Sequence, residues 1–173
     1  MRTAPWSPRT TAPERSCWCH DGDTPLTDSA REIENLLYTY ADRIDRGDLD
    51  GVADLFEHGR IHGREGGGPE TVFEGRERVR GLYGMTTRIH EDTGTPKTKH
   101  LTTNAIIEVD DEAGAATAQS NYLVTQATAE LPLQVIITGR YRDTFHRIDG
   151  RWWFDTRTMY VDQTGELGHH LTF

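Results

Sequence analysis

Between residues 29 and 46 the apolar positions follow a helical period. They recur at intervals of three and four residues, which predicts an amphipathic helix with one buried face. Ser29 and Glu32 have the S-x-x-E spacing of a capping box at its start, and Gly47 would end it. Asp45 lies on the flank of the buried face, where an ionised carboxylate is costly unless it is paired or hydrogen-bonded. The apolar positions are Ile33, Leu36, Leu37, Tyr40, Ala41 and Ile44.

The segment that follows predicts shorter elements. Asp48 is placed to cap a second helix over LDGVADLFE (49–57). RIHG (60–63) and TVFEG (71–75) have the pattern of short strands around a glycine-rich loop, GREGGGPE. That loop lacks the strand, helix and Lys-Ser/Thr frame of a phosphate-binding loop. A third helix is predicted over RERVRGLYGM (76–85).

From His100 onward the apolar positions alternate with a period of two, which is typical of β-strands. A turn at 110–114 separates the first two strands, and Asp149-Gly150 is a strong hairpin signal between the last two. Helices that precede a meander of antiparallel strands indicate an α+β fold, in which the helices cover one face of a curved sheet. The strands are predicted in LTTNAIIEVD (101–110), ATAQSNYLVTQAT (116–128) and PLQVIITGRYRDTFHRIDGRWWFDTRTMYV (132–161).

The strand that contains His100 has two faces of different character. On one face polar residues mix with apolar residues, which is unusual for a core and typical of a pocket lining. We therefore expect this face to look toward the N-terminal helix across a pocket. Its members are His100, Thr102, Asn104 and Ile106.

The opposite face of the same strand carries Leu101, Ile107 and Val109. An apolar sheet face of this kind needs a cover, so we expect a homodimer. On the last strand Trp152 and Trp153 point to opposite faces. One of them would face the pocket or core, and the other a subunit interface.

Composition narrows the class of protein. A length of 173 residues suits one domain with a proper core, and a net charge of −9 argues against a nucleic-acid partner or an anionic membrane. No apolar run approaches the roughly 18 residues that cross a bilayer, and the opening MRTAPWSPRT lacks the apolar stretch of a secretory signal. We expect a cytoplasmic protein with residues 25–173 as a single domain. Residues 1–24, rich in Pro, Thr, Arg and Ser, would be a disordered leader or the product of a misassigned start codon.

The candidates for a metal site are weak. Cys17 and Cys19 lie one residue apart, a spacing that strains a disulfide, and no second pair of ligands accompanies them. His58 and His62 have a spacing that suits a helix, but Gly59 disfavours a helix there and no third ligand is evident. We expect no metal. His169 and His170, near the end of the chain, are expected to be solvated.

Three motifs occur in an order that resembles the SnoaL-like branch of the nuclear transport factor two superfamily. They are Y-x-x-x-x-D-R-G-D (40–48), K-H-L-T-T-N (99–104) and R-Y-R-D-T-F-x-R-x-D-G-R-W-W-F (140–154). The resemblance spans about residues 25 to 165. It implies a cone-shaped α+β fold, or α+β barrel, whose curved mixed sheet and N-terminal helices enclose a deep pocket.

The resemblance also implies site residues. Scytalone dehydratase, bile-acid 7α-dehydratase and hexachlorocyclohexane dehydrochlorinase use a paired Asp and His, whose positions fall on Asp45 and His100. In the bile-acid enzyme a Tyr five residues before the Asp belongs to the site, which corresponds to Tyr40, and an Arg on the last long strand corresponds to Arg157. The remaining lining is not fixed by the resemblance. We expect substrate contacts from Asn121, Tyr141 and Trp153.

Such a pair can move a proton. An imidazole has a reference pKa of about 6.5 and can accept a proton near neutrality. Asp45 would fix the tautomer of His100 and stabilise the imidazolium, Tyr40 would donate to a leaving hydroxyl or an enolate oxygen, and Arg157 would hold an oxyanion. We expect a cofactor-free lyase or isomerase, in the first place a dehydratase, acting on a small, hydrophobic, oxygenated substrate.

Other functions fit the same sequence. Asp45 alone could be a helix-end carboxylate that bonds the amides after Gly47, and His100 alone could be structural. A polyketide cyclase would differ from a dehydratase only in its substrate, and the Arg, Ala, Gly and Asp usage hints at a bacterial source in which such proteins serve secondary metabolism. A non-catalytic module, such as the β subunit of ring-hydroxylating dioxygenases, would fill the pocket and hold the two side chains farther apart than about 4 Å.

Overall fold

A computed structural model describes residues 28–63 and 66–172 of the chain. In these residues the helices precede four long strands. The predicted leader and both cysteines lie outside these residues. The helices are α1 (Ser29–Asp45), α2 (Leu49–Asp54) and α3 (Gly75–Thr86), with a short 3-10 turn, η1, at Pro69–Thr71. The strands are β1 (Arg60–His62), β2 (Val72–Glu74), β3 (Thr98–Asp110), β4 (Ala115–Gln126), β5 (Gln134–Ile148) and β6 (Arg151–Thr164).

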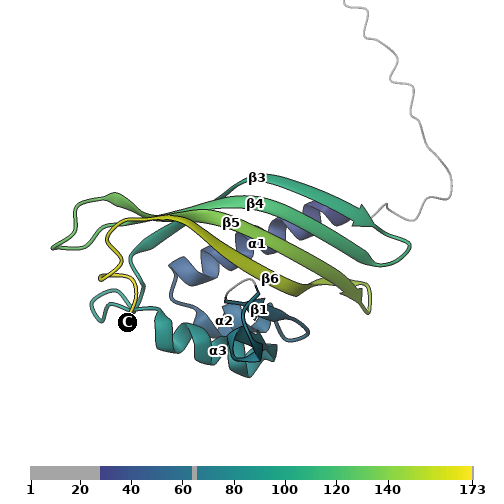
Figure 1. The fold of residues 1–173 in the computed structure, drawn as a ribbon, viewed down its shortest axis with the longest axis horizontal. Helices are drawn as coiled ribbons and strands as arrows, with labels where there is room; N and C mark the ends of the chain where they lie inside the picture. Colours follow the sequence, from purple (N-terminus) through teal and green to yellow (C-terminus); the bar gives the residue numbers. More distant parts are fainter. Residues whose placement is uncertain (1–27, 64–65, 173) are drawn as a thin grey trace, which may run out of the picture.

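The strands form one curved sheet in the order β2-β1-β6-β5-β4-β3. Neighbouring strands are antiparallel except β1 and β6, which are parallel, so the sheet is mixed. Figure 1 shows that the sheet is open, with β3 at one edge, and that α2 and α3 lie below it beside β1. The predicted α+β fold with a curved mixed sheet is therefore confirmed, although the sheet does not close into a barrel.

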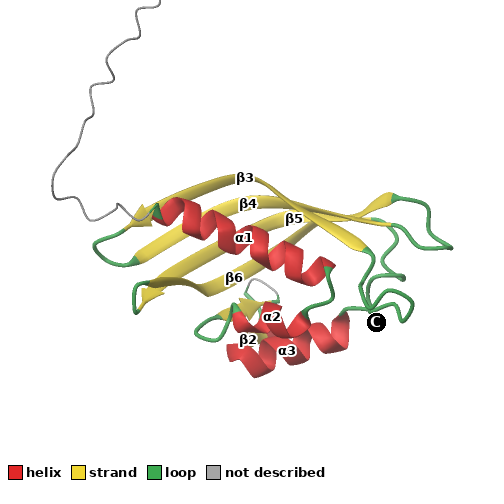
Figure 2. Cartoon of the chain, turned by 180° about the vertical axis from the view of Figure 1, so that it is seen from behind, coloured by secondary structure: helices red, strands yellow, loops and turns green. Residues whose placement is uncertain are grey.

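Helix α1 lies across one face of the long strands (Figure 2). Its apolar side chains are buried as the helical period predicts, and Ile33, Leu37 and Ile44 are at most 3% exposed. The cap is different from the prediction, because Asp28 rather than Ser29 accepts the amide of Arg31. Ser29 is buried and donates its hydroxyl to Asp111 instead.

The turn after α1 requires a glycine. Gly47 has a φ of +75°, and a Cβ atom at this position would collide with the carbonyl oxygen of Gly94. The predicted cap of α2 is confirmed, since the carboxylate of Asp48 accepts the amide of Gly51 at 2.9 Å. This tight turn fixes the point at which α1 ends, and so the position of Asp45.

A β-bulge divides β3 into two halves. Asn104 has a φ of +53°, and the pairing with β4 shifts between Thr103 and Ile106. A bulge reverses the side-chain alternation of a strand. His100 and Thr102 therefore face α1, but Asn104 and Ile106 are exposed, so the prediction that all four residues share the pocket face is wrong.

The bulge also changes the surface from which the homodimer was predicted. Ile107 and Val109 turn inward and pack against the core, while Leu101 and Ile106 are exposed on the outer face. The homodimer stays a prediction, with a smaller apolar surface to support it. No helix among the described residues has the length and apolar character needed to span a bilayer.

The end of the chain returns to the helices. Asp149 and Gly150 have φ angles of +50° and +80°, as the predicted hairpin between β5 and β6 requires. After β6 the segment 165–172, which we call the C-terminal segment, forms a β-bridge between Leu171 and Thr87 at the end of α3. One end of the space between α1 and the sheet is thereby walled by the last residues described.

Candidate functional site

Asp45 and His100 meet where α1 ends and β3 begins. Nδ1 of His100 lies 2.7 Å from Oδ1 of Asp45. The backbone amide of His100 donates to Oδ2 at 2.9 Å, and the hydroxyl of Thr98 donates to Oδ1 at 2.8 Å. The carboxylate is thus fully partnered, and Asp45 as a whole residue is 9% exposed. Its partners are on β3 and not on the amides that follow Gly47.

The position of β3 in the sheet explains this geometry. Because β3 is an edge strand, it has no second strand to pair with, and the amide of His100 can turn toward α1. A carboxylate only accepts hydrogen bonds, so Nδ1 of His100 must carry the proton in the contact with Asp45. In the neutral ring the lone pair is then on Nε2, which makes no hydrogen bond to any described residue and is free to act as a base.

The charge of Asp45 is stabilised despite its burial. Burial pushes the pKa of the carboxyl upward, but the hydrogen bonds and charge of His100, with the hydroxyl of Thr98, outweigh burial and hold this pKa below its ordinary value of 3.8. Asp45 is therefore ionised at neutral pH. An ionised partner stabilises the imidazolium that forms when His100 accepts a proton.

A cavity of about 240 Å³ opens beside His100, between the helices and the sheet. Its walls are mainly apolar, with hydroxyl and imidazole groups at a few points, as is usual for small-molecule sites. The cavity could hold a small organic molecule and bring it against Nε2 of His100. The lining residues are Tyr40, Ile44, Gly63, Leu82, Tyr83, Thr86, Thr87, His100, Tyr122, Val124, Ile137, Tyr141, Met159, His170 and Leu171.

Tyrosines make up the polar wall opposite the apolar residues. The hydroxyls of Tyr40 and Tyr83 lie 2.5 Å apart, and that of Tyr40 also approaches the Sδ atom of Met159 at 3.8 Å. Burial first, and then the neighbouring Tyr40, raise the pKa of Tyr83 well above 10.0. Burial likewise raises the pKa of Tyr141. These phenols stay protonated near pH 7 and can donate hydrogen bonds to a ligand.

Arg157 lies on β6, the last long strand, as the resemblance implied, but it is set back from the cavity. Its side chain is completely buried, does not line the cavity, and donates from Nε and Nη2 to both carboxylate oxygens of Asp143 at 2.9 and 2.8 Å. The guanidinium packs on the rings of Tyr40 and Tyr141, with its Cζ atom 4.1 and 4.0 Å from the ring centroids. Arg157 therefore lies behind the tyrosines that face the cavity. Its third nitrogen, Nη1, is enclosed and makes no hydrogen bond to a described residue, and the predicted contact of Arg157 with an oxyanion stays a prediction.

Of the three predicted substrate contacts, only one lies in the cavity, because successive side chains of a strand point to opposite faces of the sheet. Tyr141 lines the cavity, but Asn121 is exposed on the outer face of β4, and its neighbour Tyr122 takes the inward position. Trp153 also lies outside the cavity, where its ring meets that of His58 edge-on at 4.7 Å. Trp152 is the inward residue of the pair and is 2% exposed.

Tyr83 and His170 are among the lining residues that were not predicted from the sequence. Tyr83 lies four residues after Val79 on the buried side of α3, so the helical period could have found it. His170 was expected to be solvated, but it is 9% exposed and lines the cavity. Nothing in the local sequence marks it, because it reaches the site through the return of the C-terminal segment.

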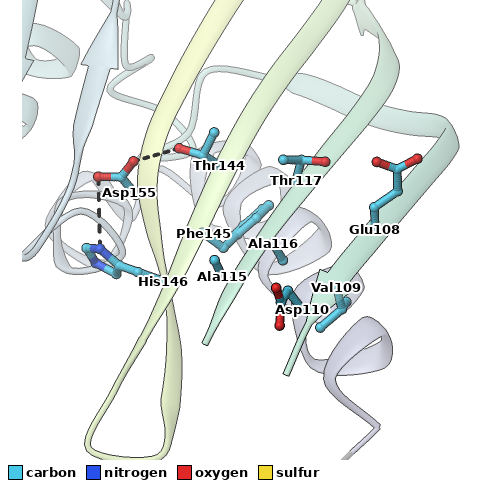
Figure 3. Close-up of a pocket in the computed structure, with 10 residues that line it drawn as sticks. All are labelled: Glu108, Val109, Asp110, Ala115, Ala116, Thr117, Thr144, Phe145, His146 and Asp155. Carbon is cyan, nitrogen blue, oxygen red and sulfur yellow. Dashed lines mark hydrogen bonds and ion pairs between the residues drawn. The ribbon is translucent and has the colours of Figure 1, made fainter. Parts of the chain in front are cut away.

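A larger hollow lies elsewhere, over the far ends of the long strands (Figure 3). It measures about 560 Å³ and contains Glu108, Asp110, His146 and Asp155. Asp155 accepts the hydroxyl of Thr144 at 2.7 Å, but Nδ1 of His146 is 3.9 Å from it, too far for a hydrogen bond. Within residues 28–63 and 66–172, no three His, Cys, Asp or Glu side chains lie close enough to share a metal. Although this hollow is larger than the cavity beside His100, its His146 and Asp155 are not hydrogen-bonded to each other as Asp45 and His100 are.

Comparison with known proteins agrees with this architecture. The profile of the SnoaL-like domain matches residues 26–158, whereas no curated protein matches the chain. A protein of unknown function from Mycobacterium tuberculosis has a TM-score of 0.62 and 28% identity, over 78% of this chain and 72% of that one. A candidate scytalone dehydratase from Novosphingobium aromaticivorans gives 0.60 and 25%, over 79% and 86%. ActVI-ORFA from Streptomyces coelicolor, at 19% identity, shares the fold with a TM-score of 0.61 over 78% and 98%.

Proposed function

Because the chain belongs to the SnoaL-like domain family, which includes dehydratases, we propose that it is a cofactor-free lyase or isomerase, and specifically a dehydratase. The substrate would be a small, largely apolar molecule that carries a carbonyl and a hydroxyl group. The similarity to a candidate scytalone dehydratase supports this reaction class.

The observation that carries the proposal is the contact of 2.7 Å between Asp45 and His100 at the wall of a cavity. A non-catalytic module has no need of such a pair, and it would gain stability by filling a cavity of about 240 Å³ with side chains. An ionised carboxylate that orients an imidazole toward an open space is instead the arrangement of a general base.

The reaction follows from the position of the groups. Nε2 of His100 removes a proton from the carbon next to the substrate carbonyl, while Asp45 stabilises the imidazolium. The hydroxyl pair of Tyr40 and Tyr83 donates to the carbonyl oxygen as it takes up negative charge, and this hydrogen bond replaces the weak contact of Tyr40 with Met159. When the enolate collapses, the neighbouring C–O bond breaks. The proton on His100 returns to the departing hydroxyl, so the products are a conjugated carbonyl compound and water.

The experiment is a turnover assay on a panel of cyclic β-hydroxyketones. Loss of water creates a conjugated enone, which is followed by its absorbance and by the mass of the product. We expect His100→Ala to reduce turnover by about 10² to 10⁴-fold, with Asp42→Asn as a matched control on the exposed side of α1. Turnover that is undiminished in His100→Ala would refute the mechanism. Cyclisation is tested with an open-chain 1,5-diketone, in which the enolate attacks the second carbonyl, and a ring-closed product of unchanged mass from this probe alone would replace dehydration by cyclisation.

A further inference from the structure

A second imidazole lies in the cavity, on the C-terminal segment. His170 lines the cavity together with Leu171 and is 9% exposed. Its ring centroid is 6.2 Å from that of His100, and the two ring planes are inclined by 65°. Of these two histidines, only His100 has a carboxylate partner among the described residues.

The backbone around His170 is fixed from two directions. The amide of Arg88, just beyond α3, donates to the carbonyl of His170 at 2.8 Å. The preceding carbonyl, that of His169, accepts the side chains of Gln126 at 3.0 Å and His90 at 3.1 Å. Because the main chain is held by these contacts, the imidazole of His170 is oriented without using either of its own nitrogens.

Both nitrogens of His170 lack a partner. Neither makes a hydrogen bond to a described residue, and Nδ1 is completely enclosed. Buried polar atoms are nearly always paired in native proteins. Because Nδ1 is enclosed by protein atoms, Nε2 is the nitrogen at which a ligand in the cavity would supply a partner. The ionisable groups that act on this ring are His100, Asp45 and His90. Burial first, and then the charge of His100, lower the pKa of His170 to about 4, so the ring is neutral near pH 7.

We propose that His170 binds the hydroxyl group of the substrate that departs, holding it between the two imidazoles; this inference rests on the dehydration proposed above. An oxygen at about 2.8 Å from one nitrogen of each ring fits between centroids that are 6.2 Å apart. The neutral ring of His170 accepts the hydrogen bond of the hydroxyl and directs a lone pair of its oxygen toward His100. The protonated Nε2 of His100 then delivers its proton to that oxygen as the C–O bond breaks. His170 itself ends the reaction unchanged.

The test uses two probes that differ by one hydroxyl group, 2-naphthol and naphthalene, with affinities measured by calorimetry or fluorescence. We expect the wild-type protein to bind 2-naphthol more tightly. His170→Phe keeps a ring of similar size but has no nitrogen, so the ratio of the two affinities should fall by about tenfold. His170→Asn, which retains a donor and an acceptor, should restore part of this ratio. His169→Phe is the control, because His169 does not line the cavity, and should leave the ratio unchanged.

The ratio separates ligand contact from packing. A role in packing alone would weaken both probes equally and leave the ratio as it is, which would overturn the inference. Equal binding of the two probes by the wild-type protein would overturn it as well. A measurement that needs no variant is the ¹⁵N resonance of the His170 ring, which should move on addition of 2-naphthol and not of naphthalene. These binding results do not depend on turnover, so they can fail while the proposed function stands, and the reverse.

Discussion

Two acid–base pairs lie between the helices and the sheet, and they differ in access. Asp45 and His100 meet at the wall of a cavity, with side chains that are 7% and 9% exposed. Asp143 and Arg157 are both completely enclosed, and a bidentate contact uses both carboxylate oxygens. One pair leaves a ring nitrogen open to the cavity. In the other pair both side chains are 0% exposed, so neither lies on the cavity surface.

The difference teaches which pair is suited to chemistry. Burial lowers the pKa of Arg157, but the charge and hydrogen bonds of Asp143 more than reverse this, so the guanidinium is always charged. Such a group cannot exchange protons, although its contact with the ring of Tyr40 holds a wall of the cavity in place. An imidazole changes its charge near neutral pH and can therefore act as a base. Variants of the two pairs should therefore differ in what they lose, stability for the enclosed pair and activity for the pair at the cavity.

The largest loss of stability is expected from the sealed pair. Asp143→Ala would leave the charge of Arg157 buried without a partner, and breaking a buried ion pair costs about 3–5 kcal/mol. Urea unfolding monitored by tryptophan fluorescence measures the change. A loss below about 1 kcal/mol would contradict the view that this pair is structural.

A somewhat smaller effect should appear when the pH is lowered. The pKa of His170 is about 4 in the folded protein and 6.5 as the ordinary value, so between these values the unfolded chain binds more protons. Stability should therefore fall as the pH drops from 6.5 to 4, by about 3 kcal/mol in total. His170→Phe should lose most of this dependence when its unfolding is measured at the two ends of that range. An equally steep pH profile in the variant would count against the burial of a neutral His170.

Asp45 should act at lower pH. Its folded pKa lies below 3.8, so its contribution is complete above pH 3.8 and is lost as the pH falls through the folded pKa. Asp45→Asn keeps the shape of the side chain but mismatches its hydrogen bonds, which we expect to cost about 1–2 kcal/mol at pH 7. Activity should fall at the same time, because the amide no longer fixes the tautomer of His100. A variant that is less stable but fully active would separate Asp45 from the chemistry.

The smallest effect is expected on the outside of the same helix. Asp42 pairs with Arg46 at 3.2 Å, but both side chains are more than half exposed. Asp42→Asn should change stability by less than about 0.5 kcal/mol and leave activity intact, as is usual for solvated ion pairs. Unfolding and turnover measured beside Asp45→Asn would show whether position on the helix decides the outcome. Similar losses of stability and activity in Asp42→Asn and Asp45→Asn would show that the two aspartates do not differ in role.

Part of this site could be predicted from the sequence. Asp45 stands in the last turn of α1, where the helix dipole disfavours a negative charge, so the sequence itself signals that a partner must compensate. The period of α1 also places Tyr40 on the buried face. The mixed face of its strand directs His100 toward the N-terminal helix, and the order of the motifs identifies it as the partner of Asp45. For these residues the local sequence and the final fold agree.

Other residues could not be placed in this way. The bulge at Asn104 changes which side chains of β3 face inward. Its positive φ is not marked in the sequence, because the residue is an asparagine and not a glycine. Asn121 lies on the outer face of β4, one position away from the inward-facing Tyr122. His170 reaches the cavity only through contacts between distant segments, such as the bridge of Leu171 with Thr87. A contact between segments so far apart in the sequence forms only when the whole chain has folded, so no local pattern predicts it.

Proton exchange at an activated carbon tests the role of His100 as a base most directly, because it needs no knowledge of the natural substrate. The probe is 2-tetralone in D₂O, with deuterium incorporation next to its carbonyl followed by NMR. The wild-type protein and Asp42→Asn should accelerate the exchange equally, whereas His100→Ala should be slower by about 10² to 10⁴-fold. Exchange in His100→Ala at the wild-type rate would show that the imidazole paired with Asp45 is not the base.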